Sequence, residues 1–439
     1  MAGGKFYDSK RRTYSGSFLQ LDADGTLADF SNFYGTNVDS LFGGTYSGLY
    51  RLGTTIDNAK MLAELQRAES GESSIFEGFA VDPSNAEILD EDSFRFNERV
   101  ISGYAMATAR FGQATVIGGV RVETTRNTID AYNLDQVQGA RYTTDRSSFT
   151  NVLPSIHVNY DFDNRTKLRS AVWTSFARPD IARMSSAREY SYDTDPDGDG
   201  TQNDTSDWVL LGIEQGNPDL KPLRSVNVDM SLEHYAGNTG AYSVALYYKR
   251  ITNFLFRSSS SNIRNATLGE NVDPTGVAIS MPNNGKSAEV YGVEISGQQL
   301  LHWLPGIFGS LGVGGNVTLQ RSTAVTGLSW HPEGYSLPLM ETPETIANLQ
   351  LFWAREGWEI YGAWNYQSKF LGGINDFGNN PYEQAYSFVD LTVRKTFMKK
   401  SSIQFQVQNL FDSHTYWQTV STGQGASRAY IKNGLNLIF

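Results

Sequence analysis

The chain has 439 residues, of which 40% are hydrophobic and 13% aromatic, with 42 Gly and no Cys. Its formal net charge of −11 argues against a nucleic-acid partner, because phosphate binding requires a basic patch. No apolar stretch approaches the roughly 18 residues that a membrane-spanning helix needs, which excludes a helical membrane protein. The lack of cysteine excludes a disulfide or zinc-thiolate framework and fits a bacterial envelope protein.

Apolar and polar side chains alternate along many segments of about ten residues. In the segment from Ile403 to Gln408, every odd residue is apolar and every even residue is polar or hydroxylated. The segment from Val226 to Glu233 repeats the pattern. Side chains on a strand point to opposite faces with a period of two, so each segment has one apolar and one polar face. The chain therefore predicts an all-β fold, an antiparallel transmembrane β-barrel.

We expect fourteen strands, at about 6–20, 94–110, 113–128, 147–162, 165–178, 224–236, 240–257, 284–301, 305–322, 344–355, 357–370, 384–397, 402–412 and 428–439. The connections between them are alternately short and long. The long ones fall near 21–93, 129–146, 179–223, 258–283, 323–343, 371–383 and 413–427. Outer-membrane barrels have short periplasmic turns and long extracellular loops, so the alternation orients the molecule, with both ends on the periplasmic side.

The two ends of the chain add two expectations. No apolar leader follows Met1, so we expect the true N-terminus to be missing from this sequence. The last strand ends on Phe439, which resembles the C-terminal signal of the bacterial barrel-assembly machinery. The alternative is an edge strand that happens to end in Phe.

A series of short motifs occurs in a fixed order, namely Leu153-Pro154-Ser155, Leu168-Arg169-Ser170-Ala171, Ala177-Arg178-Pro179, Gly216-Asn217-Pro218-Asp219-Leu220-Lys221-Pro222, Gly292-Val293-Glu294, Phe388-Val389-Asp390-Leu391 and Val407-Gln408-Asn409-Leu410-Phe411-Asp412. Together they resemble the barrel of TonB-dependent outer-membrane receptors over 94–439. The resemblance implies about 22 strands plugged by an N-terminal domain. Neither the plug nor a TonB box is found, so 1–439 is expected to be a partial barrel, with a strand at 1–20 and a long extracellular loop at 21–93.

The resemblance also implies a function and partners. A complete receptor binds a scarce solute at its extracellular loops and imports it with energy from the TonB complex, which it contacts through the plug. Outer-membrane lipid and lipopolysaccharide are expected to surround the barrel of a Gram-negative bacterium. Open alternatives are a passive porin-like channel and a secreted β-rich carbohydrate-binding protein.

Catalytic patterns are absent from the sequence. The five His residues lie far apart in different segments, and neither an HExxH motif nor a nucleophile elbow occurs. We therefore expect no enzyme activity, no catalytic residues and no required cofactor.

One acidic segment has the spacing of a calcium loop. Asp193, Asp195 and Asp197 occupy positions 1, 3 and 5, Gly198 position 6 and Asp204 position 12. Calcium prefers six to eight oxygen ligands, which alternate residues of a tight loop can supply. The spacing favours Ca²⁺ binding in this extracellular loop, and the alternative is a solvated acidic loop.

Solute contacts are expected from aromatic residues in or beside the long loops, because loops on a rigid scaffold carry recognition. The candidates are Trp208, Trp330, His331, Tyr335, Phe377, Tyr382, Tyr416 and Trp417. Aromatic faces suit both sugar rings and siderophores, and the style of the motifs favours an oligosaccharide. The alternative role for each aromatic is packing within its loop.

Charged residues also occur on the polar positions of the strands. These are Arg121, Glu123, Arg169, Asp229, Glu233, Glu294, Asp390 and Arg394. We expect them to face the lumen, where ion pairs along the wall are favoured over ligand contacts. The aromatics Trp353, Trp364 and Tyr366 are expected to face outward as part of interfacial girdles.

Overall fold

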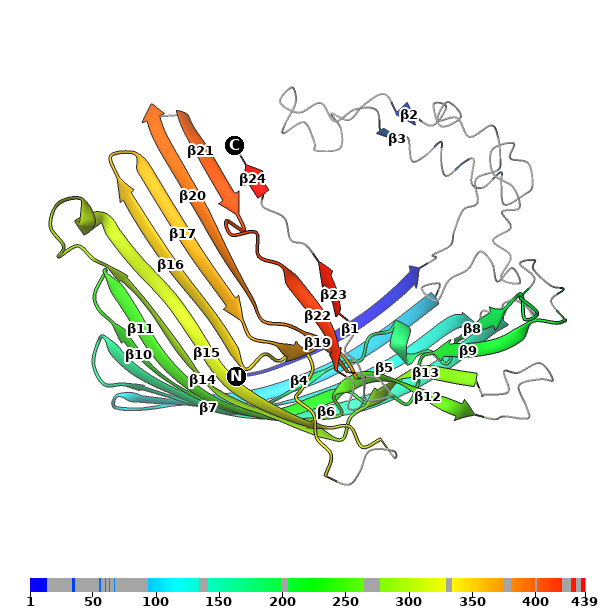
Figure 1. Cartoon of the computed structure of the whole chain (residues 1–439). Helices are drawn as coiled ribbons and strands as arrows, with labels where there is room; N and C mark the ends of the chain where they lie inside the picture. Colours follow the sequence, from blue (N-terminus) through cyan, green and yellow to red (C-terminus); the bar gives the residue numbers. More distant parts are fainter. Residues whose placement is uncertain are drawn as a thin grey trace.

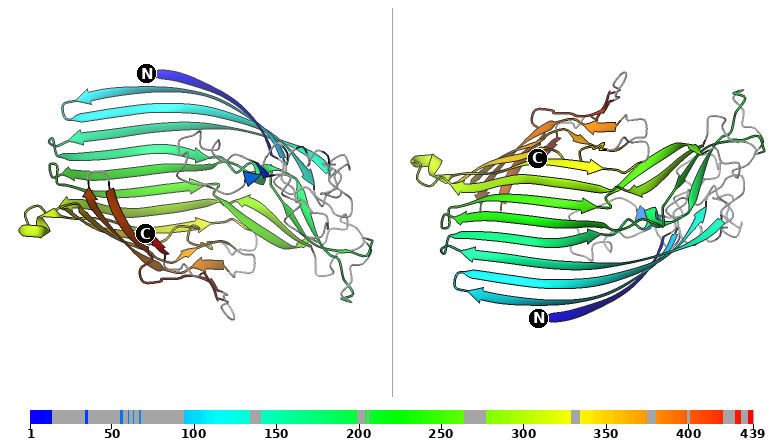
Figure 2. Two further views of the ribbon diagram at one scale, coloured as in Figure 1. Left: turned by 90° about the horizontal axis from the view of Figure 1, so that it is seen from above. Right: turned by 90° about the horizontal axis from the view of Figure 1, so that it is seen from below.

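The computed structural model describes residues 1–13, 34–35, 55–56, 60, 63, 67, 94–133, 141–198, 204, 206–263, 277–328, 334–374, 380–398, 401–420, 428–431 and 436–438. Its main element is a 14-stranded antiparallel sheet whose strands follow one another in chain order (Figures 1 and 2). The sheet is strongly curved, and β1 and β24 are its edge strands among the described residues. No described helix is long and apolar enough to cross a membrane.

The strands of the main sheet are β1 (Ala2–Thr13), β4 (Phe94–Phe111), β5 (Ala114–Asn133), β6 (Arg141–Asp161), β7 (Thr166–Ala177), β10 (Leu223–Tyr235), β11 (Gly240–Thr252), β14 (Ser287–Leu300), β15 (Leu311–Val325), β16 (Thr345–Arg355), β17 (Trp358–Gln367), β20 (Tyr386–Met398), β21 (Ser401–Gln408) and β24 (Asn436–Ile438). Each of the fourteen expected strands overlaps one of them. The alternation of side chains was therefore sufficient to count the strands.

Some expected boundaries were wrong. The first strand begins at Ala2 and ends at Thr13, whereas 14–20 lies outside the described residues. The interval 129–146 is mostly strand, because β5 continues to Asn133 and β6 begins at Arg141. The expected closing strand is divided: β23 (Arg428–Ile431) pairs with a loop strand and only β24 joins the main sheet. Phe439 lies outside the described residues.

The two faces of the main sheet carry different side chains. Cross-strand rows on one face, called the apolar face, consist of Val228, Tyr248 and Tyr291, then Met230, Leu246 and Val293, then Leu232, Val244 and Ile295. The opposite face, called the polar face, carries Asp229, Glu233 and Glu294 on the same strands. A shift of the strand pairing by one residue would exchange the two faces. Burial of either face therefore fixes the register of the strands.

The apolar face has a clear upper boundary on β4 and β5. Ile101, which is 54% exposed, lies opposite Thr124, and the next row on this face pairs Arg99 with Arg126. Residues 101–111 of β4 number eleven, which agrees with the about 9–11 residues that a barrel strand needs to cross a bilayer. β5 and β6, with 20 and 21 residues, therefore extend well beyond this band.

Short turns gather at one end of the sheet and long connections at the other, as expected (Figure 2). In the turn after β6, the Asp163 carboxylate accepts hydrogen bonds of 2.6 Å from the backbone N–H groups of Arg165 and Thr166. These bonds hold the pKa of Asp163 below its usual value. The connection after β14 contains the short helix η3 (Gly306–Ser310).

Expected outward aromatics lie on the apolar face. Trp364 pairs with Leu349 and Tyr366 with Ala347 across β16 and β17, and the Trp364 and Tyr366 rings stack with centroids 6.0 Å apart. Trp353 lies on the same face at the short-turn end. Their positions near the two edges of the apolar band agree with interfacial girdles.

The long connections contain further strands, most of which lie in segments that were expected to be loop. One small sheet has the order β12-β13-β9-β8, from β8 (Arg188–Asp193), β9 (Val209–Gln215), β12 (Leu255–Ile263) and β13 (Val277–Asn284). A second has the order β18-β19-β22-β23, from β18 (Phe370–Leu371), β19 (Asn380–Glu383), β22 (Thr415–Val420) and β23. A third pairs β2 (Tyr34–Gly35) with β3 (Thr55–Ile56) inside the expected loop 21–93.

The apolar face predicts a sharp difference between neighbouring substitutions on β11. We expect Leu246→Arg to destabilise the protein in lipid vesicles by about 2–4 kcal/mol, because it places a cation against lipid near the midplane. Ala245→Arg, on the polar face opposite Glu294, is the matched control and should cost far less. Urea unfolding of both variants in vesicles measures the difference. Equal losses would contradict the assignment of the faces.

Candidate functional site

The candidate site is the long-connection end of the polar face, called the mouth below. Here the connection after β7, with its short helix η2 (Ala182–Met184), and the connections around 216–222, 253–256, 335–340 and 370–374 pack onto the sheet. Their side chains form two buried apolar clusters on the wall. The mouth is therefore a covered region, unlike the wall nearer the short turns.

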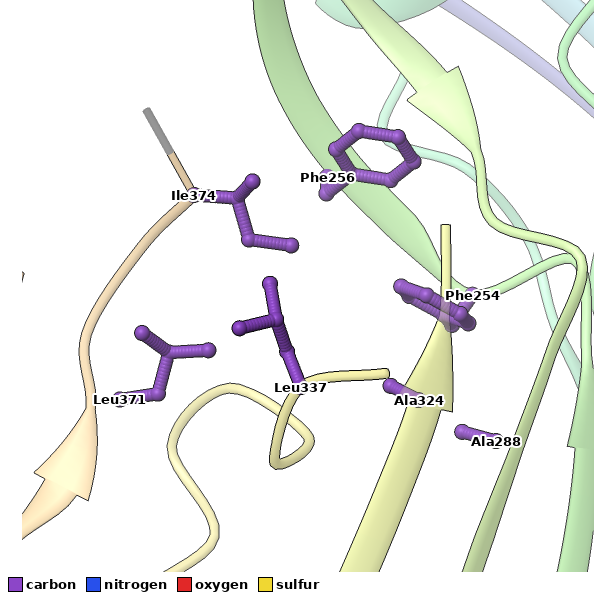
Figure 3. Packing of buried hydrophobic residues seen from close by; sticks show 7 residues of the cluster. All are labelled: Phe254, Phe256, Ala288, Ala324, Leu337, Leu371 and Ile374. Atoms are coloured by element: carbon purple, nitrogen blue, oxygen red, sulfur yellow. The ribbon is translucent and has the colours of Figure 1, made fainter. Parts of the chain in front are cut away.

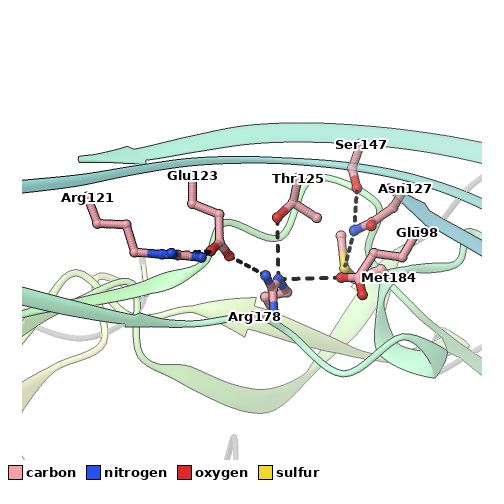
Figure 4. A network of polar contacts seen from close by, with 8 residues as sticks. All are labelled: Glu98, Arg121, Glu123, Thr125, Asn127, Ser147, Arg178 and Met184. Atoms are coloured by element: carbon pink, nitrogen blue, oxygen red, sulfur yellow. Dashed lines mark hydrogen bonds and ion pairs between the residues drawn. The ribbon is translucent and has the colours of Figure 1, made fainter. Parts of the chain in front are cut away.

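Arg178 attaches the first of these connections to the wall (Figure 4). Its guanidinium group forms an ion pair with Glu123 on β5, lies 3.4 Å from a Glu98 oxygen on β4, and donates to the Thr125 hydroxyl at 3.3 Å. Glu123 is only 6% exposed and also accepts from Arg121 at 2.5 Å. Two guanidinium groups thus compensate one buried carboxylate, which satisfies the condition for burying a charge.

Apolar contacts continue above this ion-pair cluster. Met184 and Leu220, 1% and 3% exposed, pack against Phe96 and Ile129 on the wall. Leu220 belongs to the segment 216–222, one of the motifs that carry the family resemblance. At its start, the Asn217 amide nitrogen donates to the Pro282 carbonyl at 3.1 Å. The motif therefore anchors one connection to the wall and to a neighbouring hairpin.

Two asparagine side chains complete this junction. The Asn284 side-chain oxygen accepts from the Lys221 N–H at 2.7 Å, and its amide nitrogen donates to the Lys221 and Asn253 carbonyls at 3.0 Å. Asn253 has a φ of 57° and donates to the Pro222 carbonyl at 3.2 Å. Asn tolerates the left-handed region better than most residues. The segment 216–222 and the β12–β13 hairpin are thus bound to each other by asparagine side chains that bond to backbone groups.

The second cluster joins the two larger loop sheets (Figure 3). Phe254 and Phe256, 3% and 2% exposed, pack in one cluster with Leu337, Leu371 and Ile374, above the small wall residues Ala288 and Ala324. Leu337 exchanges two backbone hydrogen bonds with Ala324, of 2.6 and 2.9 Å. Small side chains on the wall leave room for these loop residues to approach the strands.

Two of the predicted solute-binding aromatics pack on this second cluster, and two more lie on β22 (Thr415–Val420) of the adjoining loop sheet. Tyr335 and Tyr382 pack against it, and Trp417 pairs with Glu383 across β19 and β22. Tyr416, the neighbour of Trp417, is 45% exposed. Burial raises the pKa of the Tyr382 hydroxyl, and the nearby Tyr335 raises it further. Contact of these four residues with a solute stays a prediction.

The other predicted aromatics are placed differently or lie outside the described residues. Trp208 lies against Tyr192 beside the other loop sheet, with ring centroids 6.1 Å apart. Trp330, His331 and Phe377 lie outside the described residues.

The acidic segment begins in the loop that follows β8. Asp193 is the last residue of β8, and its carboxylate accepts from the Asp195 N–H at 3.1 Å. Gly198 has a φ of 70°, so the chain turns there as the loop pattern requires. Asp197 and Asp204 are described, but Asp199 and its neighbours up to 203 are not. Within the described part of the chain, no group of three His, Asp or Glu residues could hold a metal ion. Calcium binding stays a prediction.

Several of the charges on the wall below the mouth form the expected ion pairs. Arg169 lies 3.0 Å from Glu233, and Arg394 lies 3.5 Å from a Glu359 oxygen. Asp229 accepts from the Trp173 indole at 2.5 Å. A hollow of about 670 Å³ on this wall is lined by Arg169, Asp229 and Glu294, among others.

Comparisons with known proteins agree with this architecture. The family model described as "TonB dependent receptor-like, beta-barrel" matches residues 2–410. An iron-regulated outer membrane virulence protein of Vibrio cholerae serotype O1 is 24% identical over 310 residues, which cover 69% of this chain and 41% of that protein. The chain thus spans well under two thirds of the relative's length.

Solved structures show the same fold. The ferric-catecholate import receptor from E. coli K12 has a TM-score of 0.53 at 16% identity, covering 83% of this chain and 47% of that one. The ferric yersiniabactin uptake receptor from Yersinia pestis has a TM-score of 0.51 at 14% identity, covering 79% and 45%. The chain belongs to the TonB-dependent receptor β-barrel family, whose members are outer-membrane proteins. This location does not support the alternative of a secreted protein.

Sequence reasoning missed the residues that organise the mouth. Arg178 was noted only as part of a motif, and neither Glu98 nor the pair Asn253 and Asn284 was singled out. Glu98 shares the inward face of β4 with the buried residues Phe96 and Val100, and a carboxylate between two apolar inward positions was the available signal for it. Nothing in the sequence alone indicates that Asn284 reaches Lys221.

The buried ion pair predicts strong coupling between two positions. In a double-mutant cycle with Arg178→Ala and Glu123→Gln, we expect a coupling energy of about 1–3 kcal/mol in urea unfolding, since Glu123 is buried. The matched pair Arg169 and Glu233 has side chains 47% and 20% exposed, so its coupling should stay below about 1 kcal/mol. Similar coupling energies for both pairs would contradict the inference that burial strengthens the interaction between Arg178 and Glu123.

The raised pKa of Glu383 predicts that the stability of the loop sheet at the mouth depends on pH. Burial raises its pKa, so the fold favours the neutral carboxyl and loses stability as pH rises through the raised value. Glu383→Gln should therefore slow amide exchange of peptides covering β19 and β22 by about twofold at pH 7.5 and leave it unchanged at pH 4. Hydrogen exchange read by mass spectrometry, at matched pH, tests this. An equal effect at both pH values would argue against it.

Proposed function

We propose that this chain is the barrel part of a receptor that binds a scarce solute at the mouth and, in the complete protein, imports it with energy delivered by the TonB complex through a plug domain. The observation that carries this proposal is the family match over residues 2–410. The covered mouth supports it, because aromatic side chains from separate connections meet there on a rigid wall.

The solute class that we propose first is a ferric chelate. The support comes from two relatives of Vibrio cholerae, which are iron-regulated outer membrane virulence proteins at 24% and 23% identity. Tyr416 offers an aromatic face at the edge of the mouth that a catecholate ring can stack on.

An oligosaccharide is the second candidate. The observation in its favour is that Tyr416 and Trp417 lie beside Tyr382 on one loop sheet, since sugar rings also bind on aromatic faces. A passive channel is a third outcome and predicts conductance without saturable uptake.

Uptake by cells that express the complete protein distinguishes these functions. We expect saturable uptake of ⁵⁵Fe from ferric catecholate, abolished when the TonB gene is deleted. Tyr416→Ala should weaken binding about tenfold, whereas Tyr416→Phe keeps the ring and should bind normally. Tyr235, similarly exposed at 40% but located at the short-turn end, provides the matched control Tyr235→Ala.

The outcomes separate the candidates. Uptake of a labelled maltooligosaccharide, without uptake of iron, would replace the first solute by the second. Uptake that neither saturates nor depends on TonB would favour the passive channel and contradict the receptor.

A further inference from the structure

A cluster of basic side chains lies on the apolar face immediately above its apolar band. In the first row beyond Ile101, Arg99 on β4 is directly opposite Arg126 on β5. The next row contains Lys10 on β1 and Arg146 on β6. All four side chains are exposed. We call Lys10, Arg99, Arg126 and Arg146 the basic patch.

Like charges directly opposite each other on paired strands are destabilising, so the Arg99 and Arg126 pairing needs a physical reason. The neighbouring carboxylate Asp8 lies 3.3 Å from Arg99. Arg126, Arg146 and Lys10 form no ion pair with another described residue. The patch thus holds an excess of positive charge in a chain whose net charge is −11.

At the same level on another part of the sheet, a positive charge lies opposite a negative one. Beyond Tyr248 and Tyr291, the next row pairs Arg250 with Glu289. An excess of positive charge is therefore not a general property of this level of the barrel.

The level of the patch identifies what it faces. The lipid band on β4 ends at Ile101, and one row further along a strand is about 7 Å, which places Arg99 and Arg126 among the headgroups of the leaflet at the long-connection side. That side is extracellular in outer-membrane barrels. Arg binds phosphate through a planar fork of donors, and two opposed guanidinium groups can share one phosphate.

We propose that the basic patch binds the phosphate groups of lipopolysaccharide in the outer leaflet, with Arg99 and Arg126 on one phosphate and Arg146 and Lys10 beside it. The bound phosphate removes the repulsion between the two opposed arginines. The site lies on the outer wall, separate from the mouth and independent of the imported solute.

Binding of lipid A to the detergent-solubilised chain tests this site. Native mass spectrometry should show the wild-type chain binding bisphosphorylated lipid A and binding dephosphorylated lipid A at least about tenfold more weakly. Arg126→Gln with Arg146→Gln should weaken binding of the phosphorylated form about tenfold to thirtyfold. Arg126→Lys with Arg146→Lys keeps the charges and should bind more tightly than the Gln variant.

A matched control uses cations at the opposite edge of the same face. Arg355 and Lys395 lie there in register with Trp358. Arg355→Gln with Lys395→Gln removes the same charge and should leave lipid A binding unchanged. Slower gel migration after heating confirms that each variant was folded. Equal weakening by the two double Gln variants, no weakening by Arg126→Gln with Arg146→Gln, or equal binding of dephosphorylated lipid A would overturn the proposal.

Discussion

The structure depends on one constraint, which is that each strand must offer an apolar side to lipid and a polar side to water while pairing all its backbone groups. Met230 and Leu246 on one face, and Asp229 on the other, are products of this constraint, because one shifted residue would exchange them. The same requirement explains why the apolar face changes at Arg99 and Arg126. Beyond the lipid band, nothing penalises charge on that side.

On the inner wall the chemistry changes along the strand for a different reason. Near the short turns the wall is exposed to solvent, and charges there pair across strands, as Arg169 does with Glu233. At the mouth the connections cover the wall, so the inward positions become apolar, with Phe96 and Ile129 under Met184. Glu123 lies between the solvent-exposed wall and the covered mouth. It is buried yet charged, and two arginines are needed to hold it there.

This difference explains how much the sequence could predict. The number of strands and the placement of short and long connections followed from alternation, because lipid imposes it on every crossing strand. Alternation was a poor guide beyond the lipid band. There β5 continues to Asn133, and its outer side is polar, although Asn127 and Ile129 still face inward. The loop sheets and the mouth depend on contacts between distant segments, such as Asn284 with Lys221, which no local pattern encodes. Of the predicted aromatics, Tyr335 and Tyr382 were found together, but only the structure shows that they pack on Leu371 and Phe254.

The contacts at the mouth also determine how its parts can move. Asn253 ties the β12–β13 hairpin to the segment 216–222, and its neighbour Phe254 packs with Leu371 from the other loop sheet. A displacement of either loop sheet must therefore separate apolar surfaces at this cluster, at about 25 cal/mol for each Å² exposed. Because Leu220 fixes the segment 216–222 to the wall, a displacement of the hairpin must also break the Asn253 and Asn284 hydrogen bonds or the Leu220 contacts. A displacement of the β18–β19–β22–β23 sheet breaks none of these amide hydrogen bonds, so the mouth opens more easily by movement of this sheet than by movement of the hairpin.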